Sequence, residues 1–197
     1  VYLVSLLLLA FSIAGMVQVH TTGNIVDDLP ENDRVLIDLA WLEDNFNGVM
    51  PFEMLIDCGV EGDALSLRNL KKLERMQRLL SEYPEFSKSM SAVDATKFAM
   101  QGLNNGKKSG YRLPISNNEK MKLRSYTRRT EEKTNGSGDA ASVTRNFLDS
   151  SKTITRISAQ IADIGTLEMD ELMTDLRPRI DSIFPPSKYT VTLTGTS

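Results

Sequence analysis

Two pairs of carboxylates have the residue types that acid-base or metal chemistry uses. Glu53 and Asp57 lie four residues apart in a stretch that alternates like a β-strand, so both face the same side. At the usual rise they are about 13 Å apart, whereas the carboxyl groups of a glycosidase lie at most about 9.5 Å apart. Asp27 and Asp28 are adjacent but lack further oxygen ligands for calcium. We expect neither pair to form a catalytic or metal site.

The chain has one cysteine, Cys58, and one histidine, His20. An internal disulfide or a multi-cysteine metal site is therefore excluded, and a zinc site built on histidine is implausible. We expect Cys58 to be a small apolar residue at a strand end, and His20 to be interfacial, with pH sensing as its alternative. The sequence also lacks a nucleophile-base pair and a Gly-rich phosphate loop. It predicts a protein that is not an enzyme and that holds no cofactor and no metal.

A basic insertion at 104–145 is the strongest candidate for a binding surface. It carries ten Lys and Arg against four Asp and Glu, a balance of +6, while the rest of the chain has a balance of −9. The net charge of −3 argues against binding to nucleic acid. The insertion is either a solvated, partly helical surface or a contact for anionic lipid or a partner. The residues expected to make such a contact are Lys120, Lys122, Arg124, Arg128 and Arg129.

The first nineteen residues carry no charged side chain. As a helix they would span about 28 Å, close to the bilayer's hydrocarbon thickness of about 30 Å. A signal peptide would begin with Met and a basic region, and the other alternative, a buried core helix, rarely lacks charge over this length. We therefore expect residues 1–19 to be a transmembrane helix, and we expect the sequence to open inside this helix or at its start. Four acidic residues precede the first basic one, Arg34, which places residues 20–197 outside.

Hydrophobic periodicity predicts alternating helices and strands after Pro30. Asn32 or Asp33 can cap the first helix, and Pro178 is expected to kink the last helix. Trp41 is expected to extend the apolar face of the first helix by packing, with a place at a lipid surface as its alternative. The predicted elements are a helix with apolar residues at Val35, Leu39, Leu42 and Phe46, a strand at 52–57, a helix at 66–82, a strand at 86–93, a helix at 95–103 capped by Asp94, a strand at 153–161, a helix with apolar residues at Leu167, Leu172, Leu176, Ile180 and Phe184, and a strand at 189–194.

The order of these elements predicts the fold class. Strand, helix and strand precede the insertion, and strand, helix and strand follow it. Two split βαβ halves of this kind favour an α+β domain with a four-stranded antiparallel sheet and helices on one face, which is the ferredoxin-like pattern. The sequence therefore predicts one such domain over 20–197, with a helical insertion at 104–145 and one transmembrane helix before it.

Several motifs together resemble a known transporter superfamily. They are VDDLP at 26–30, DL at 38–39, NFNGVMPFEMLID at 45–57 and YTVTLTGTS at 189–197. With the apolar segment before them, they resemble resistance-nodulation-division (RND) exporters, and more narrowly the hydrophobe/amphiphile exporters related to MMPL lipid transporters. The DDLP and GVMP pair is most similar to the second of the two periplasmic loops of those proteins. The basic insertion matches no motif of the superfamily.

The resemblance implies a fragment of a bacterial inner-membrane transporter. Such a transporter has two repeated halves, each with a periplasmic porter domain after its first membrane helix. Proton flux through acidic residues in central membrane helices, which this chain does not contain, would drive the export of lipid-like or amphiphilic molecules. The expected partners are the lipid bilayer, an amphiphilic substrate, the other half of the transporter and further copies in an oligomer. The alternative is an extracytoplasmic sensor or scaffold domain of a single-span membrane protein.

Overall fold

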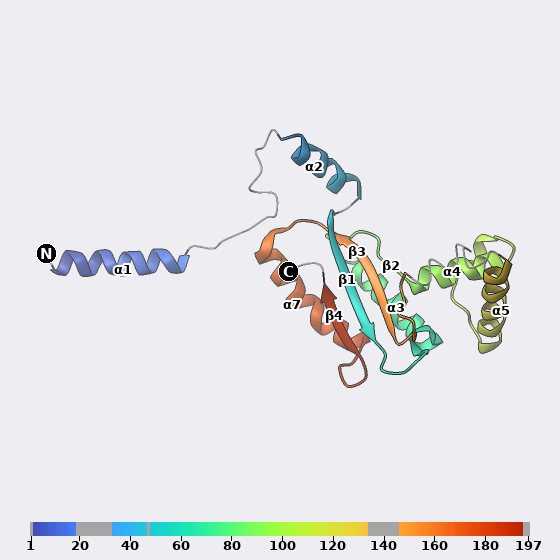
Figure 1. The fold of residues 1–197 in the computed structure, drawn as a ribbon. Coiled ribbons are helices and arrows are strands. Elements are labelled where there is room, and N and C mark those ends of the chain that lie inside the picture. The colour runs from blue at the N-terminus through green and yellow to red at the C-terminus, as the bar shows by residue number, and fades with distance from the viewer. Residues whose placement is uncertain (1, 19–32, 47, 134–145, 195–197) are drawn as a thin grey trace.

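The computed structural model describes residues 2–18, 33–46, 48–133 and 146–194 (Figure 1). Within these ranges the protein is α+β, with a four-stranded antiparallel sheet and six α-helices. Helix α1 (Tyr2–Gln18) has 17 residues without charge. None of the helices in the described ranges combines the length and the hydropathy that a membrane crossing requires.

The four predicted strands lie in one sheet, as expected. The strand order is β2-β3-β1-β4, and each neighbouring pair is antiparallel. In the register, Met54 pairs with Ile157 on one side and with Leu193 on the other. Three strands match their predicted ranges closely, but β2 is much shorter than 86–93, because Phe86 forms only an isolated bridge to Ile161. The strands are β1 (Met50–Asp57), β2 (Met90–Ser91), β3 (Ile154–Ile161) and β4 (Thr190–Thr194).

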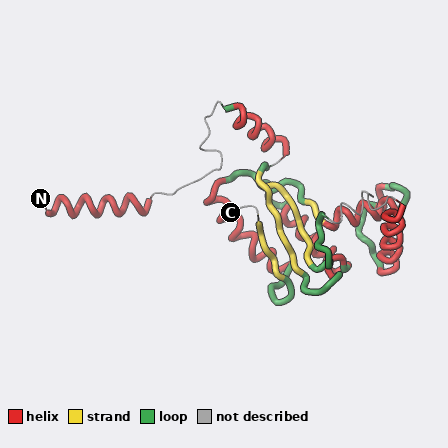
Figure 2. Tube along the Cα trace, in the orientation of Figure 1, coloured by secondary structure: helices red, strands yellow, loops and turns green. Residues whose placement is uncertain are grey.

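Helices α3 (Leu67–Leu80) and α7 (Gly165–Ile183) cover the buried face of this sheet (Figure 2). Alternate residues of β1 and β3 point into the core, as their period of two predicts. Apolar residues from the strands and both helices form one cluster, and its fully buried members include Phe52, Met54, Ile56, Leu73, Ile157, Ile161, Leu176 and Ile180. The opposite face is more polar, and there Arg156 Nη1 lies 3.0 Å from Glu53 Oε1.

Helix α4 (Ala92–Leu103) begins three residues earlier than the sequence predicts. Ser91, not Asp94, is the cap, because its extended backbone directs its hydroxyl to the Val93 N–H at 3.1 Å. Asp94 instead accepts the Ser91 N–H at 3.0 Å and completes a capping box. A second correction concerns α7, where Leu167 is 47% exposed, so the buried stripe starts only at Leu172.

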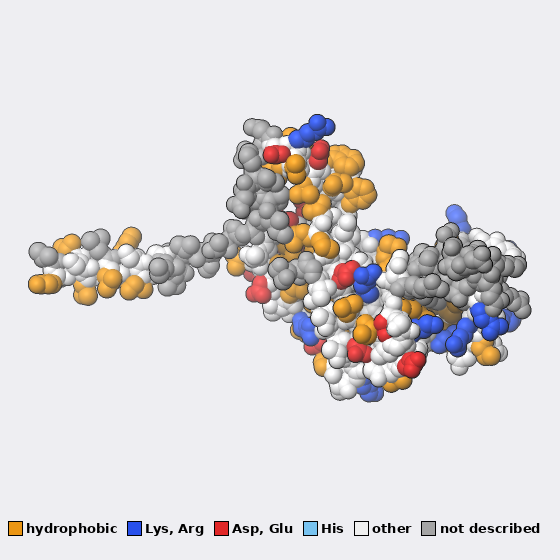
Figure 3. All heavy atoms as spheres, in the orientation of Figure 1, with side chains coloured by type: hydrophobic (Ala, Val, Ile, Leu, Met, Phe, Trp, Pro, Cys, Tyr) orange, Lys and Arg blue, Asp and Glu red, His pale blue; other side chains and the backbone are white. Residues whose placement is uncertain are grey.

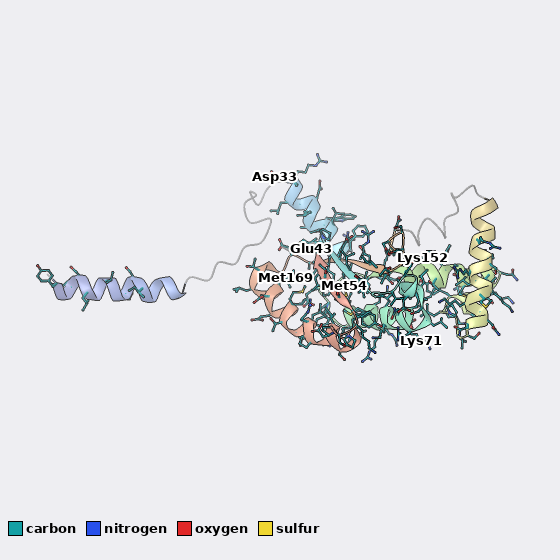
Figure 4. All side chains as sticks on the ribbon, turned by 60° about the horizontal axis from the view of Figure 1, so that its bottom comes forward. Asp33, Glu43, Met54, Lys71, Lys152 and Met169 are labelled. Carbon is teal, nitrogen blue, oxygen red and sulfur yellow. The ribbon has the colours of Figure 1, made fainter. Side chains whose placement is uncertain are left out.

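Helix α2 (Arg34–Phe46) is capped by Asp33, whose Oδ1 accepts the Val35 N–H at 2.8 Å. At its other end, Glu43 Oε1 accepts the Asp163 N–H at 2.9 Å and so joins α2 to the residues after β3 (Figure 4). Trp41 does not pack into a core as expected: it is 60% exposed and contacts the edge of Phe46. The helix is exposed because few elements cover it, and orange side chains gather on it in Figure 3. Its exposed large apolar residues are Val35, Ile37, Trp41, Leu42 and Phe46.

The junction between α2 and β1 depends on a glycine. Gly48 has φ +120°, a conformation that L-residues rarely adopt. A Cβ at this position would lie 2.5 Å from the carbonyl carbon of Ile161 and 2.7 Å from its oxygen. Only glycine therefore lets the chain pass directly against the end of β3 before β1 begins.

Candidate functional site: a basic helical arm

The basic insertion supplies helix α5 (Asn117–Lys133), which forms an arm beside the sheet together with α4, the helix just before the insertion (Figure 1). Helix α5 packs on α4 through Leu123, which is buried together with Ala99 and Met100. The Tyr126 ring lies close to Gly102, where an added Cβ would come within 3.0 Å of the Tyr126 hydroxyl. The predicted partly helical character of the insertion is confirmed by α5. The Asn-Gly-Ser-Gly sequence at 135–138 predicts a flexible segment from its composition, and residues 134–145 lie outside the described ranges.

A charged clamp holds the first turn of α5. Arg112 donates to both carboxylate oxygens of Glu119, at 2.9 and 2.8 Å. The Ile115 N–H donates to the same carboxylate at 2.8 Å, and the Ser116 hydroxyl accepts the Glu119 N–H at 3.3 Å. The hydrogen bonds from Arg112 and Ile115 lower the pKa of Glu119 to about 2. Glu119 is therefore engaged chiefly by the clamp, and the positive charge of Lys122 farther along the helix also lowers its pKa.

The base of the arm is tied to α3 by polar contacts that the sequence did not predict. Gln77 Nε2 donates to Asp94 Oδ2 at 2.7 Å and to the Ser89 carbonyl at 3.0 Å. Lys97 Nζ lies 2.8 Å from Glu74 Oε1. These contacts join α3 and α4 at residues 17 and 23 positions apart in sequence, so no local pattern reveals them. They fix the direction in which the arm leaves the sheet.

The five basic residues predicted to make a contact all belong to α5, but they do not share one face. At 3.6 residues per turn, Lys120, Arg124 and Arg128 follow one another at steps of four and form a single row. Lys122 is exposed on another side of the helix, and position 129 falls near the side of Lys122; the Arg129 side chain is outside the described part. The structure thus brings three of the five together, and Lys and Arg side chains gather over the arm in Figure 3.

The residues that could have done chemistry have structural partners. Cys58 is 6% exposed, and burial, followed by the negative charges of Asp63 and Asp57, raises its pKa to about 11. Asp57 Oδ1 accepts the Gly59 N–H at 2.7 Å, and Glu53 pairs with Arg156. At neutral pH the Cys58 thiol is therefore protonated, which opposes a role as a nucleophile. The remaining candidates, His20, Asp27 and Asp28, lie outside the described residues.

A shallow pocket of about 390 Å³ lies where β1 ends and β4 begins. Beneath it, the Tyr189 hydroxyl donates to Asn69 Oδ1 at 2.8 Å, and Lys72 Nζ lies 4.3 Å from the Tyr189 ring centroid. The one sequence signal for this pocket is Asn69, a buried polar residue in α3. Across the described ranges, no three His, Cys, Asp or Glu side chains are grouped to hold a metal ion. The pocket is lined by Cys58, Gly59, Val60, Asp63, Arg68, Lys188 and Tyr189.

No model of a known protein family matches this sequence, and a comparison with curated proteins gives no match.

Proposed function

We propose that this chain is a periplasmic porter domain of an RND-type exporter of lipid-like or amphiphilic molecules, with a membrane helix before it. The observation that carries the proposal is the strand order β2-β3-β1-β4. In this order β3 lies between β1 and β2, which α3 connects, and β1 lies between β3 and β4, which α7 connects. Two interleaved split βαβ units are the arrangement expected of a ferredoxin-like porter domain.

The geometry at the GVMP sequence supports the same proposal. The conformation of Gly48 and its close approach to Ile161 give this motif a structural role at the entrance to the sheet. The chain also enters and leaves the sheet at one end, because β1 starts at Met50 and the last residue of β4, Thr194, pairs with Glu53. In a transporter, both connections to membrane helices would then leave from the same side of the domain.

The apolar surface of α2 is where this domain would contact an amphiphile. Val35, Trp41 and Phe46 are each more than half exposed. Transfer of apolar surface out of water is worth about 25 cal/mol per Å² and does not depend on headgroup chemistry. Such a surface binds varied amphiphiles weakly and releases them, as a conducting domain must. The energy for transport would come from proton flux in membrane helices outside this chain.

The proposal can be tested on the parent gene and on the protein. A parent sequence with further membrane spans after residue 197 is expected; a parent with a single span would support the sensor or scaffold alternative instead. In the protein, Trp41 is the only tryptophan and lies on α2, so its emission reports directly on this surface. We expect a neutral amphiphile to shift that emission in chains held in neutral-lipid nanodiscs.

Two variants make the measurement specific to α2. Replacing Val35→Ser and Phe46→Ser is expected to weaken the amphiphile response, because Phe46 lies against Trp41 and Val35 is a further exposed apolar side chain of the same helix. The matched control is Met90→Ser with Ile154→Ser, which removes exposed apolar side chains from the sheet. An emission that does not respond to amphiphile, or a control that weakens the response equally, would contradict the proposed contact.

A further inference from the structure

Positive charge is concentrated on the arm, whereas the rest of the chain is acidic. The net charge of the whole protein is −3, yet the row of Lys120, Arg124 and Arg128 lies on one helix, with Arg124 and Arg128 exposed. At 3.6 residues per turn, Arg124 is about 100° and Arg128 about 140° around the helix from Leu123, the residue that packs on α4. Arg124 and Arg128 therefore face away from the α4 contact, whereas Lys120, about 60° from Leu123, is half-buried at the side of that contact. The acidic residue of the first turn, Glu119, is held by Arg112.

The form of this surface limits what it can bind. Arg124 and Arg128 are exposed on the outer side of a helix, and the pocket at the end of β1 shares no residue with α5. A row of charges on the outer side of one helix can meet a broad anionic plane. Apolar side chains lie beside the charges: Met121 is 68% exposed, and Ile115, just before the helix, is 74% exposed. Basic residues with a few exposed apolar neighbours are typical of helices that lie at a lipid interface.

We infer that the solvent side of α5 docks on the anionic surface of a lipid bilayer, with Lys120, Arg124 and Arg128 toward the headgroups and Met121 at their boundary. This inference goes beyond the proposed function, because the arm carries none of the motifs that resemble RND exporters. It requires a membrane as partner but no transport of substrate. A domain without porter activity would dock in the same way.

The test places a reporter on the arm of the full chain. Trp41→Phe with Met121→Trp moves the single tryptophan to the exposed side of α5. The chain is added to vesicles of phosphatidylcholine alone and of phosphatidylcholine mixed with phosphatidylglycerol. The two kinds of vesicle differ in headgroup charge, so a difference in the emission of the α5 reporter is assigned to the anionic lipid. We expect a blue shift of its emission in the mixed vesicles alone, and loss of that shift near 1 M salt, where the Debye length is about 3 Å.

Charge variants identify the residues that act. In the reporter chain, Lys120→Gln, Arg124→Gln and Arg128→Gln together should lower the ratio of docked to undocked arm by about a hundredfold. The matched control, Lys71→Gln, Arg75→Gln and Lys88→Gln, removes the same charge from exposed positions outside the arm and should leave docking near that of the parent. Circular dichroism checks that each variant stays folded.

Three results would overturn the inference. The first is the same emission in neutral and mixed vesicles. The second is an equal loss of docking in the control variant, which would mean that total charge and not the arm is responsible. The third is a shift caused by soluble polyglutamate but not by mixed vesicles, which would identify an acidic polypeptide as the partner. None of these results bears on amphiphile binding at α2, so the proposed function is tested separately.

Discussion

Replacing Gly48→Ala tests how far the α2–β1 junction depends on one missing side chain. The new Cβ would lie 2.5 Å from the carbonyl carbon of Ile161, 2.7 Å from its oxygen and 2.8 Å from the Ala162 nitrogen, and all three atoms are backbone, so no flexible side chain can move aside. The junction or the end of β3 must shift. The backbone conformation at φ +120° adds about 1–3 kcal/mol for a residue with a Cβ. Because Ile161 is fully buried, displacing it also disturbs the core.

The matched control is Gly59→Ala. Gly59 also has a positive φ, +70°, but nothing lies within 4 Å of its added Cβ, so about 1–2 kcal/mol of backbone strain is the whole effect. We expect Gly48→Ala to lower the free energy of unfolding by at least about 3 kcal/mol, because the clash adds to its strain. Urea denaturation of the full chain, followed by circular dichroism, measures both values. Equal losses in the two variants would refute the close contact with β3.

The remaining predictions concern the core, the first segment and the arm. Ile157→Asp buries an unpaired charge at a fully buried position and should unfold the domain, whereas Gln160→Asp on the exposed side of β3 should change stability by about 1 kcal/mol or less; an unchanged melting temperature for Ile157→Asp would contradict the core assignment. Deleting residues 1–19 should leave a folded, soluble remainder, and aggregation would mean that this segment packs against the domain. Because the pKa of Glu119 is lowered to about 2, its clamp with Arg112 contributes fully to stability above the ordinary carboxyl pKa of about 4.5, and this contribution is lost as the pH falls toward 2. The NMR shift of the Glu119 carboxyl and amide exchange in α5 should both show this loss. Titration of Glu119 at the ordinary pKa would exclude the clamp.

The strands and the core could be predicted because each depends on a local repeat. In β3, Thr155, Ile157, Ala159 and Ile161 alternate with polar residues, and a strand with one buried face turns every second residue inward. Caps were predicted less well, since Ser91 and Asp94 are both good capping residues and only the backbone decides which of them lies at the cap. For β2, the predicted strand at 86–93 is longer than the observed one, because only Met90 and Ser91 pair with β3 and the length of the pairing depends on the partner strand.

For the candidate arm too, some features could be predicted from the sequence and others required the fold. Composition alone located the basic stretch and its five candidate residues, because net charge is additive along the chain. Which of them share a face required the start and phase of α5, and these are set by the contact of Leu123 with α4 and by the clamp of Arg112 on Glu119.

The sequence by itself determined the positions of the strands, the apolar first segment and the separation of charge, since these follow from the order of residue types along the chain. Tertiary structure alone decided exposure. Val35 and Phe46 have the spacing of a buried stripe, yet they remain exposed because few of the described elements cover α2. Gly48 carries no periodic signal, but the close passage of β3 makes its missing side chain necessary. Burial and close contact depend on which distant segments meet, and that information belongs to the fold as a whole.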